Sequence, residues 1–382
     1  MIALFQNYAR RPISIVEGKG TIVKDSTGKR YVDFTSGIAV CSLGHAHPAI
    51  VKAIQEQSEK LWHISNLYES PGQVKLAESL VKDLPLSHAF FCNSGAEANE
   101  AAIKLARKHT GKHNIIVFEQ SFHGRTFGAM SATGQDKVRK GFGPLVSNFT
   151  TLPFNDVEAL KASIDDSVAA IMLEMIQGEG GVNAVTPEFA AAINEITANS
   201  DILLIVDEVQ TGIGRTGTRF AFEQFGLQPN IVSMAKGLGG GFPIGGILGT
   251  ANLFDTFSAG THGTTFGGNP LAVAVAQTVI DHVFDEAFLA DVQQKSTYLV
   301  SKLQEALPAD TFAIQGKGLM LGLYCGGEDV APFVAQLEEA GLLVVSAGPK
   351  VIRLLPPLTV SEQEMDEAVA ILKQVLTAAV VK

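Results

Sequence analysis

The chain has 382 residues, of which 46% are hydrophobic and 18% charged, a composition typical of a globular protein with two or three domains. The formal net charge of −10 argues against a nucleic-acid-binding protein and against attachment to anionic membranes, because a polyanion would repel the chain. The sequence has no apolar run of about 18 residues, which argues against a transmembrane helix.

The N-terminal segment MIALFQNYARRPIS does not have the order of a secretory signal, because its few apolar residues precede Arg10 and Arg11. The three cysteines, Cys41, Cys92 and Cys325, lie far apart in the sequence and form no C-x-x-C motif. Such isolated cysteines are typical of reduced core thiols. We therefore expect a cytoplasmic protein.

Short segments of alternating polar and apolar residues come first. In residues 13–34, ISIVEGKGTIVKDSTGKRYVDF, turn-forming residues separate two such segments, which predicts a small antiparallel sheet. From about residue 50 to 280, short apolar segments alternate with helical ones, and this pattern predicts a mostly parallel sheet with helices on both faces. The predicted strands are residues 88–93, 114–119, 169–174, 202–207, 230–236 and 245–250.

Two helices in the last third of the chain have clear start signals. Asn269 and Pro270 are typical of the cap and first turn of a helix, and Ser361 with Glu364 forms the capping box of the final amphipathic helix. We predict one large α/β domain over residues 49–284. A smaller α+β domain is expected to combine residues 1–48 with residues 285–382.

The segment GIGRTG at residues 212–217 matches the dinucleotide-binding pattern G-x-G-x-x-G. In such sites the first glycine follows a strand directly, and an acid appears about 20 residues later. Here four residues separate the strand end Asp207 from Gly212, and the next strand ends in Lys236 rather than in an acid. A nicotinamide-dependent dehydrogenase is therefore a weak alternative.

Asp207 and Lys236 both end predicted parallel strands, at the edge where open α/β sheets bind ligands. Pyridoxal phosphate requires a lysine for covalent attachment and an acid beside its pyridine nitrogen, so the two residues could share that cofactor. They could also be a turn-capping acid and a solvated lysine. These two residues alone leave both interpretations open.

Three further segments contain residues suited to such a cofactor. In NSGAEANE a strand runs through Gly95 and Ala96 into a helix, whose free N–H groups attract an anion, although a plain strand-to-helix turn has the same pattern. In SFHGRT, Phe122 can stack on a ring and Arg125 can bind a carboxylate. In HGTTFGGNP, two hydroxyl side chains precede a helix cap and could contact a phosphate.

The ordered motifs of the chain resemble those of the subgroup III aminotransferases. The motifs are NSGAEANE, SFHGRT, LEMIQGEGG, DEVQTGIGRTG, MAKGLGGGFPIGG, HGTTFGGNP and VIRLLPPL, and together they extend over essentially the whole chain. The resemblance implies the α/β fold of aspartate aminotransferase and pyridoxal 5'-phosphate as cofactor. It also implies a homodimer with active sites at the subunit interface.

The resemblance assigns roles to the residues around the cofactor ring. Lys236 is expected to hold the cofactor covalently and to act as general base and acid, and Asp207 to pair with the protonated ring nitrogen. Gln210 is expected to bind the ring hydroxyl oxygen. Val209 is expected to support the ring face opposite Phe122.

The same resemblance assigns the phosphate contacts. Gly95 and Ala96 are expected to bind the phosphate through their backbone N–H groups. Thr265 is expected to reach the phosphate from the partner subunit, and Thr264 to lie near the substrate.

Three charged residues are assigned to substrates. Arg353 in VIRLLPPL is expected to hold the α-carboxylate of amino acid and 2-oxo acid, and Arg125 the distal carboxylate of glutamate or 2-oxoglutarate. Glu179 in QGEGG is expected to pair with Arg353 and to mask or release it. Glu179 could instead be a surface acid in a loop.

The resemblance favours an ω-aminotransferase of arginine biosynthesis that acts on N2-acetylornithine and 2-oxoglutarate. Ornithine, 4-aminobutyrate, succinylornithine and succinyl-diaminopimelate are rival donors. The apolar Ile38 argues against ornithine, because ornithine-specific members of the family have a tyrosine near this position. A binding protein that keeps the cofactor pocket without turnover is the alternative outside enzymes.

The segment GHAHP contains His45 and His47, a pair that could face a metal ion from a strand. No third ligand is evident, so we expect no metal site and interpret the pair as part of a turn. Small-molecule amino acids and 2-oxo acids are the expected partners besides a second copy of the chain.

Overall fold

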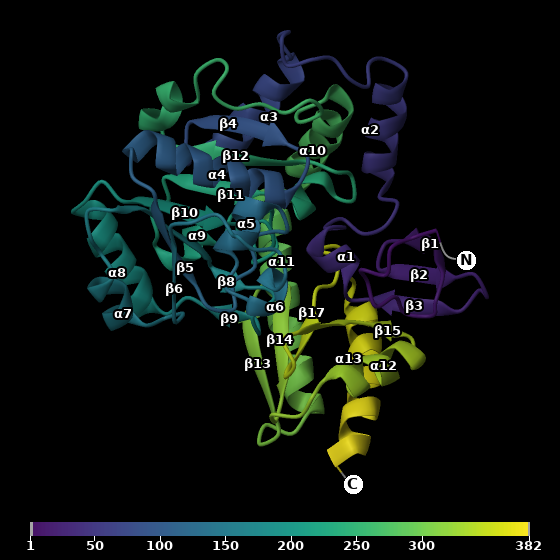
Figure 1. Ribbon diagram of the computed structural model, residues 1–382. Coiled ribbons are helices and arrows are strands. Elements are labelled where there is room, and N and C mark those ends of the chain that lie inside the picture. Colours follow the sequence, from purple (N-terminus) through teal and green to yellow (C-terminus); the bar gives the residue numbers. More distant parts are fainter. Residues whose placement is uncertain (1–2, 381–382) are drawn as a thin grey trace.

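The computed structural model describes residues 3–380, and it contains a large mostly parallel sheet with helices on both faces (Figure 1). The large sheet has the strand order β4-β12-β11-β10-β7-β5-β6. Its strands are β4 (His88–Cys92), β5 (Asn114–Phe118), β6 (Phe149–Leu152), β7 (Val168–Glu174), β10 (Leu203–Asp207), β11 (Ile231–Met234) and β12 (Gly245–Gly249).

The strand directions confirm the predicted fold class. Strand β10 pairs in parallel with β7 and β11, and β5 pairs in parallel with β6 and β7. Only β12 runs antiparallel to its neighbours β4 and β11 within the described part of this sheet. The carboxyl ends of β7, β10 and β11 therefore meet at one edge.

Alternate strand residues enter two different apolar clusters, which explains why helices cover both faces. Ile205 packs in one cluster with Ala98, Ala101 and Leu105 of a single helix, α4 (Gly95–Thr110). The next residue, Val206, packs in the other cluster, which contains side chains of several helices. The strands are thus buried on both sides, as continuous apolar runs predict.

Helices precede, connect and follow the strands of the large sheet, and several of them lie over its faces (Figure 1). They are α2 (Pro48–Ser58), α3 (Pro71–Val81), α4, α5 (Phe127–Ala132), α6 (Asp136–Arg139), α7 (Val157–Ala162), α8 (Pro187–Ala198), α9 (Phe222–Phe225) and α10 (Pro270–Val283), with the 3-10 helices η1 (Lys236–Gly239) and η2 (Ala251–Phe257). A short ribbon of β8 (Ile176–Gln177) and β9 (Asn183–Ala184) follows β7.

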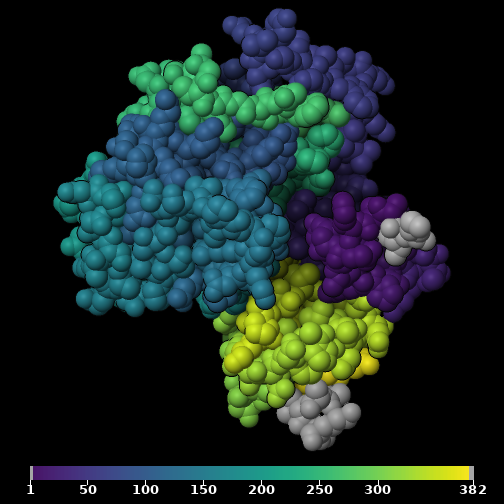
Figure 2. Space-filling view, in the orientation of Figure 1, coloured from purple at the N-terminus to yellow at the C-terminus, as the bar shows by residue number. Residues whose placement is uncertain are grey.

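The N-terminal sheet segment and the C-terminal segment lie side by side, next to the large sheet (Figures 1 and 2). The predicted antiparallel sheet is present as β1 (Ile15–Lys19), β2 (Ile22–Asp25) and β3 (Arg30–Asp33), and β15 (Leu342–Leu343) joins it in parallel beside β3. This pairing supports the predicted division into domains, which stays a prediction.

The remaining C-terminal elements form a second sheet with helices against it. The sheet has the order β13-β14-β17-β16, built from β13 (Phe312–Lys317), β14 (Met320–Cys325), β16 (Val345–Ala347) and β17 (Val351–Leu354). The helices are α11 (Glu286–Ala306), α12 (Ala331–Glu339) and α13 (Glu362–Val380). No helix among residues 3–380 is long and apolar enough to cross a membrane.

Both predicted helix starts are confirmed. The Oδ1 atom of Asn269 accepts a hydrogen bond from the N–H of Ala272 at 2.9 Å, and α10 begins at Pro270. At α13, the N–H and hydroxyl of Ser361 donate to Glu364, whose own N–H donates to the Ser361 hydroxyl.

Two local expectations differ from the structure. The predicted strand 230–236 ends at Met234, because Ala235 and Lys236 leave the strand conformation and Lys236, with φ of 42°, opens η1. The thiols of Cys92 and Cys325 are buried, as expected of core cysteines, whereas Cys41 is half-buried.

Candidate active site

A cavity of about 430 Å³ lies at the carboxyl edge of the large sheet, a size suited to a small ligand. It combines residues of the helix start at α4, of the loop after β5, of the end of β10 and of the loop after β11. Eight predicted site residues line it: Gly95, Ala96, Phe122, Arg125, Asp207, Val209, Gln210 and Lys236.

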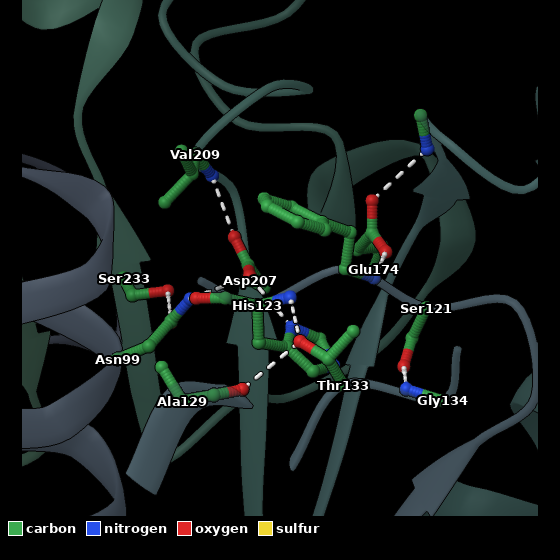
Figure 3. Close-up of polar contacts among 12 residues, drawn as sticks. Asn99, Ser121, His123, Ala129, Thr133, Gly134, Glu174, Asp207, Val209 and Ser233 are labelled. Carbon is green, nitrogen blue, oxygen red and sulfur yellow. Dashed lines mark hydrogen bonds and ion pairs between the residues drawn. The ribbon is translucent and has the colours of Figure 1, made fainter. Parts of the chain in front are cut away.

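Asp207 lines the cavity, and both of its carboxylate oxygens accept hydrogen bonds or lie within hydrogen-bond distance of a donor (Figure 3). Its Oδ2 accepts from Asn99 Nδ2 at 2.8 Å and stands 2.7 Å from His123 Nδ1, while Oδ1 accepts from the N–H of Val209 at 3.0 Å. Asn99 is itself oriented, since its Oδ1 accepts from the Ser233 hydroxyl at 2.6 Å. These contacts fix the direction of the Asp207 side chain.

His123 and Glu174 are buried beside Asp207 (Figure 3). Burial alone would lower the pKa of His123, but the hydrogen bond and charge of Asp207 outweigh it and raise this pKa. Burial raises the pKa of Glu174, which accepts from the N–H groups of Phe122 and Gly178. The contact with His123 therefore joins a buried imidazole to the Asp207 carboxylate, which lines the cavity.

Lys236 enters the cavity from the start of η1. Its backbone is left-handed, with φ of 42°, a conformation that non-glycine residues adopt at a cost and that often marks functional positions. Burial, and next the charge of Arg353, lower the pKa of Lys236 to about 8. A lysine with this pKa can exchange protons near neutral pH.

The first turn of α4 also lines the cavity, through Ser94, Gly95 and Ala96. Ser94 caps the helix, since its hydroxyl accepts from the N–H of Glu97 at 3.2 Å. The N–H groups of Gly95 and Ala96 come first in the helix and donate to no acceptor among residues 3–380. Free N–H groups at a helix start form an anion site.

Gly95 is required by close packing. A Cβ atom at this position would lie 2.7 Å from Cγ1 of Val209. The α4 start and the Val209 side chain therefore approach as closely as they do only because residue 95 has no side chain.

Arg353, on β17, is buried and reaches the loop after β10. Its Nη1 donates to Gly178 O at 2.6 Å and to Gln210 Oε1 at 2.9 Å, and its Nη2 lies 2.8 Å from Glu179 Oε1. Neither Arg353 nor Glu179 lines the cavity directly, but Gln210 joins them to its wall. The amide oxygen of Gln210 is thus engaged by Arg353.

Arg125 and the two threonines lie further out. Arg125 is exposed at the rim of the cavity, and its guanidinium carbon stands 5.5 Å from the centre of the Phe122 ring. Thr264 and Thr265 do not line this cavity. They line a neighbouring pocket, where the Thr264 hydroxyl accepts from Asn93 Nδ2 at 3.2 Å.

Sequence reasoning missed Asn99, His123 and Glu174. All three lie inside the motifs NSGAEANE, SFHGRT and LEMIQGEGG. Their polar character within these motifs is the sequence signal that could have identified them as partners of Asp207. The strand register explains the position of Glu174, because this residue on β7 is paired with Asp207 on β10.

The described residues fit pyridoxal phosphate. The cavity offers an anion site with unbonded N–H groups, the carboxylate of Asp207 and the amine of Lys236, with Phe122 and Val209 also in its lining. Residues 3–380 contain no group of three or more histidine, cysteine, aspartate or glutamate side chains placed to hold a metal ion.

The chain is similar to proteins of one family over nearly its whole length. The Aminotransferase class-III family matches residues 5–376. The acetylornithine aminotransferase of Bacillus cereus is 54% identical over 375 residues, which are 98% of this chain and 97% of that protein. The acetylornithine aminotransferase of Halalkalibacterium halodurans is 56% identical over 381 residues, 99% of each chain.

Two solved structures resemble the fold closely. The ornithine aminotransferase of Toxoplasma gondii has a TM-score of 0.94 at 32% identity, over 99% of this chain and 93% of that chain. The N-acetylornithine aminotransferase of Stenotrophomonas maltophilia has a TM-score of 0.84 at 36% identity, over 98% of each chain.

Proposed function

Because the chain belongs to the class-III aminotransferases, we propose that it transfers the terminal amino group of N2-acetyl-L-ornithine to 2-oxoglutarate. The products are N-acetyl-L-glutamate 5-semialdehyde and L-glutamate. The chain is a pyridoxal-phosphate-dependent aminotransferase, and this reaction places it in arginine biosynthesis. The full-length identity of 56% to a protein named acetylornithine aminotransferase is the observation that carries the choice of donor.

When bound, pyridoxal phosphate supplies an electron-accepting ring that stabilises negative charge on the substrate carbon that loses a proton. Gly95 and Ala96 are the residues that would hold its phosphate, and Asp207 the residue that would keep its ring nitrogen protonated. Phe122 and Val209 would hold the ring from its two faces. Each assignment is supported by the position of the residue in the cavity lining.

Lys236 is the residue proposed to move the proton. Its pKa of about 8 lets the Nζ atom accept a proton from a substrate carbon and return it at a neighbouring position. The charge of Arg353 contributes to the lowered pKa and disfavours a second cation at Nζ. The same lysine is the covalent attachment point for the cofactor.

Arg353, Glu179 and Arg125 are proposed to sort the two substrates. Glutamate reacts at its α-amine, so its α-carboxylate lies beside the reacting carbon and needs a cation there. Acetylornithine reacts at its far end, where no carboxylate is present, and a bare Arg353 would be left unpaired. The 2.8 Å ion pair with Glu179 satisfies Arg353 during that half of the cycle. Arg125 would hold the distal carboxylate of glutamate.

A homodimer is proposed from exposed apolar side chains next to the pocket of Thr264 and Thr265. The imidazole of His63 stands 5.1 Å from the Phe266 ring, and Asn66 Nδ2 donates to Gly267 O at 3.0 Å. The exposed apolar side chains of these segments include Leu61, Trp62, Leu67, Tyr68 and Phe266. An apolar surface of this kind favours burial against a second copy, which would bring Thr265 to the phosphate of the partner site.

Substrate competition tests the proposed donor. We expect kcat/KM with 2-oxoglutarate to be highest for N2-acetylornithine among acetylornithine, ornithine, 4-aminobutyrate, succinylornithine and succinyl-diaminopimelate. A higher kcat/KM for any other donor would show that this donor, and not acetylornithine, is the preferred substrate. Glutamate should change the absorbance of the bound cofactor and 2-oxoglutarate should restore it, whereas a binding protein without turnover would respond to neither.

A further inference from the structure

We propose that Asp33 and His45 are positioning residues of the active site, which hold a left-handed turn against the loop that carries Lys236. The turn consists of residues 36–39 and lies between the N-terminal sheet and the cavity. The kinetic part of the inference rests on the proposed aminotransferase function, and its structural part does not.

The turn has an unusual backbone. Ser36, Ile38 and Ala39 have φ values of 41°, 65° and 61°, and Gly37 between them has 65°. Left-handed helical geometry is unfavourable for non-glycine residues, so a turn of this kind persists only where its surroundings hold it. The residues that hold this turn in place are therefore the ones with a positioning role.

Asp33 holds the start of the turn. Its side chain is buried at the end of β3. The Oδ1 atom accepts from the N–H and hydroxyl of Thr35 at 2.8 and 2.7 Å and from the N–H of Ser36 at 3.1 Å. Three donors on one oxygen fix the point at which the chain turns left-handed.

His45 holds the other oxygen of the same carboxylate. Its Nε2 atom stands 2.7 Å from Asp33 Oδ2. The hydrogen bond to Asp33 is the main cause that raises the pKa of His45 to about 10, so the imidazole is cationic at neutral pH. The backbone of His45 is fixed as well, because it exchanges two hydrogen bonds with Gly20, at 2.8 and 2.9 Å.

The turn and the residues after it contact the residue next to Lys236 and the residue that follows β17, the strand of Arg353. The Ser42 hydroxyl donates to Gly237 O at 3.1 Å, directly after Lys236, and the Ser36 hydroxyl donates to Leu355 O, just beyond β17. Val40 lines the cavity itself. A shift of this segment would therefore move one wall of the cavity and the backbone next to the lysine.

The competing explanation is that Asp33 only stabilises the N-terminal sheet, and Asp25 offers a matched control. Asp25 ends β2 of the same sheet, and its Oδ1 accepts from the N–H and hydroxyl of Thr27 and from the N–H of Lys29, at 2.9, 2.6 and 3.0 Å. Its Oδ2 accepts from the Tyr31 hydroxyl at 2.9 Å. The two acids thus make the same kind of contacts, but only Asp33 acts on a segment that reaches the cavity.

The experiment compares Asp33→Asn and His45→Gln with Asp25→Asn in the full chain. Two readouts are used: kcat and KM with acetylornithine and 2-oxoglutarate, and amide hydrogen exchange over residues 36–42 and 236–241 in the cofactor-free protein. We expect Asp33→Asn and His45→Gln to lower kcat by about 10- to 100-fold, with KM changed less than about threefold, because misplacement by about 1 Å has this effect. Exchange in both segments should accelerate.

Asp25→Asn should leave kcat and exchange in these two segments unchanged, even where thermal unfolding shows a similar loss of stability. The double variant Asp33→Asn with His45→Gln should be no worse than the more damaged single variant, because both act through one contact. If Asp33→Asn fails to fold, His45→Gln and Ser42→Ala are compared with Asp25→Asn by the same two readouts.

Unchanged kcat together with unchanged exchange in Asp33→Asn and His45→Gln would overturn the proposal and leave a structural role alone. If instead the unmodified chain shows no turnover of acetylornithine, the proposed function fails. The exchange comparison among the three variants then still tests whether Asp33 and His45 order the loop of Lys236.

Discussion

Arg353 and Glu179 form an ion pair of 2.8 Å in which the guanidinium is buried, with 1% of its side chain exposed, while the carboxylate retains 32% exposure. The buried partner cannot move far, because Nη1 is also bonded to Gly178 O and Gln210 Oε1. The carboxylate lies in the loop between β8 and β9 and is reached by solvent. Of the two residues, Glu179 is therefore the one that can swing away and release Arg353.

Glu179→Gln should damage the acetylornithine half-reaction more than the glutamate half-reaction. Without its carboxylate partner, Arg353 is an uncompensated buried cation when acetylornithine is bound, whereas the α-carboxylate of glutamate pairs with it directly. We expect the ratio of kcat/KM for acetylornithine to that for glutamate to fall about tenfold. Single-turnover measurements of each half-reaction give this ratio, and equal losses in both would contradict the switching role.

Lys236→Ala should abolish turnover while the cavity keeps its shape. Loss of the proposed general base and acid costs about 10²–10⁴-fold in rate, and loss of the attachment point adds to this. The proposed phosphate contacts at Gly95 and Ala96 are backbone N–H groups on another element, α4, so we expect the variant to bind pyridoxal phosphate without a covalent bond. Steady-state kinetics and equilibrium dialysis are the measurements. A variant with undiminished turnover would show that another residue moves the proton.

Gly95→Ala should weaken cofactor binding by about tenfold. The added Cβ would lie 2.7 Å from Val209 Cγ1, so either the α4 start or the Val209 side chain must shift, and both are proposed cofactor contacts. Gly249→Ala, at the end of β12, is the control, because its added Cβ would meet Leu253 Cδ1 at an ordinary 3.5 Å. Titration of both cofactor-free variants with pyridoxal phosphate measures the effect, and equal affinities would show that the close approach at Gly95 is dispensable.

The fold class could be predicted from the sequence because apolar periodicity indicates which faces of the strands are buried. That Asp207 and Lys236 line one cavity could be predicted because parallel strands end at the same edge of a sheet. The sequence did not predict the bonds from Asn99 and His123 to Asp207. Such bonds depend on side-chain directions from α4 and the loop after β5, which only tertiary packing sets. For the same reason the bond between Gln210 and Arg353, far apart in the chain, was not foreseen.

Glu208 is a buried carboxyl next to Asp207 in the sequence, and it is not among the residues that line the cavity. Its Oε2 accepts from the Thr211 hydroxyl at 2.5 Å and its Oε1 from the N–H of Phe222 at 2.8 Å. Burial raises the pKa of Glu208 from 4.5 to about 7. Since the folded-state value lies above the unfolded one, the protonated form stabilises the fold. This stabilisation is complete below pH 4.5 and is lost as the pH rises through the folded-state pKa of about 7.

Glu208→Gln removes that titration while it keeps an oxygen that can accept from Phe222. Between pH 5.5 and 7 the native protein should lose about 1.5 kcal/mol of unfolding free energy relative to the variant, because the slope of about 1.36 kcal/mol per pH unit flattens near the folded-state pKa, and it should lose only about 0.4 kcal/mol more up to pH 8. Urea unfolding of both proteins at pH 5.5, 7 and 8 measures the difference, and all other titrating groups cancel because the two chains share them. Parallel profiles for the two proteins would mean that Glu208 stays ionised throughout this range.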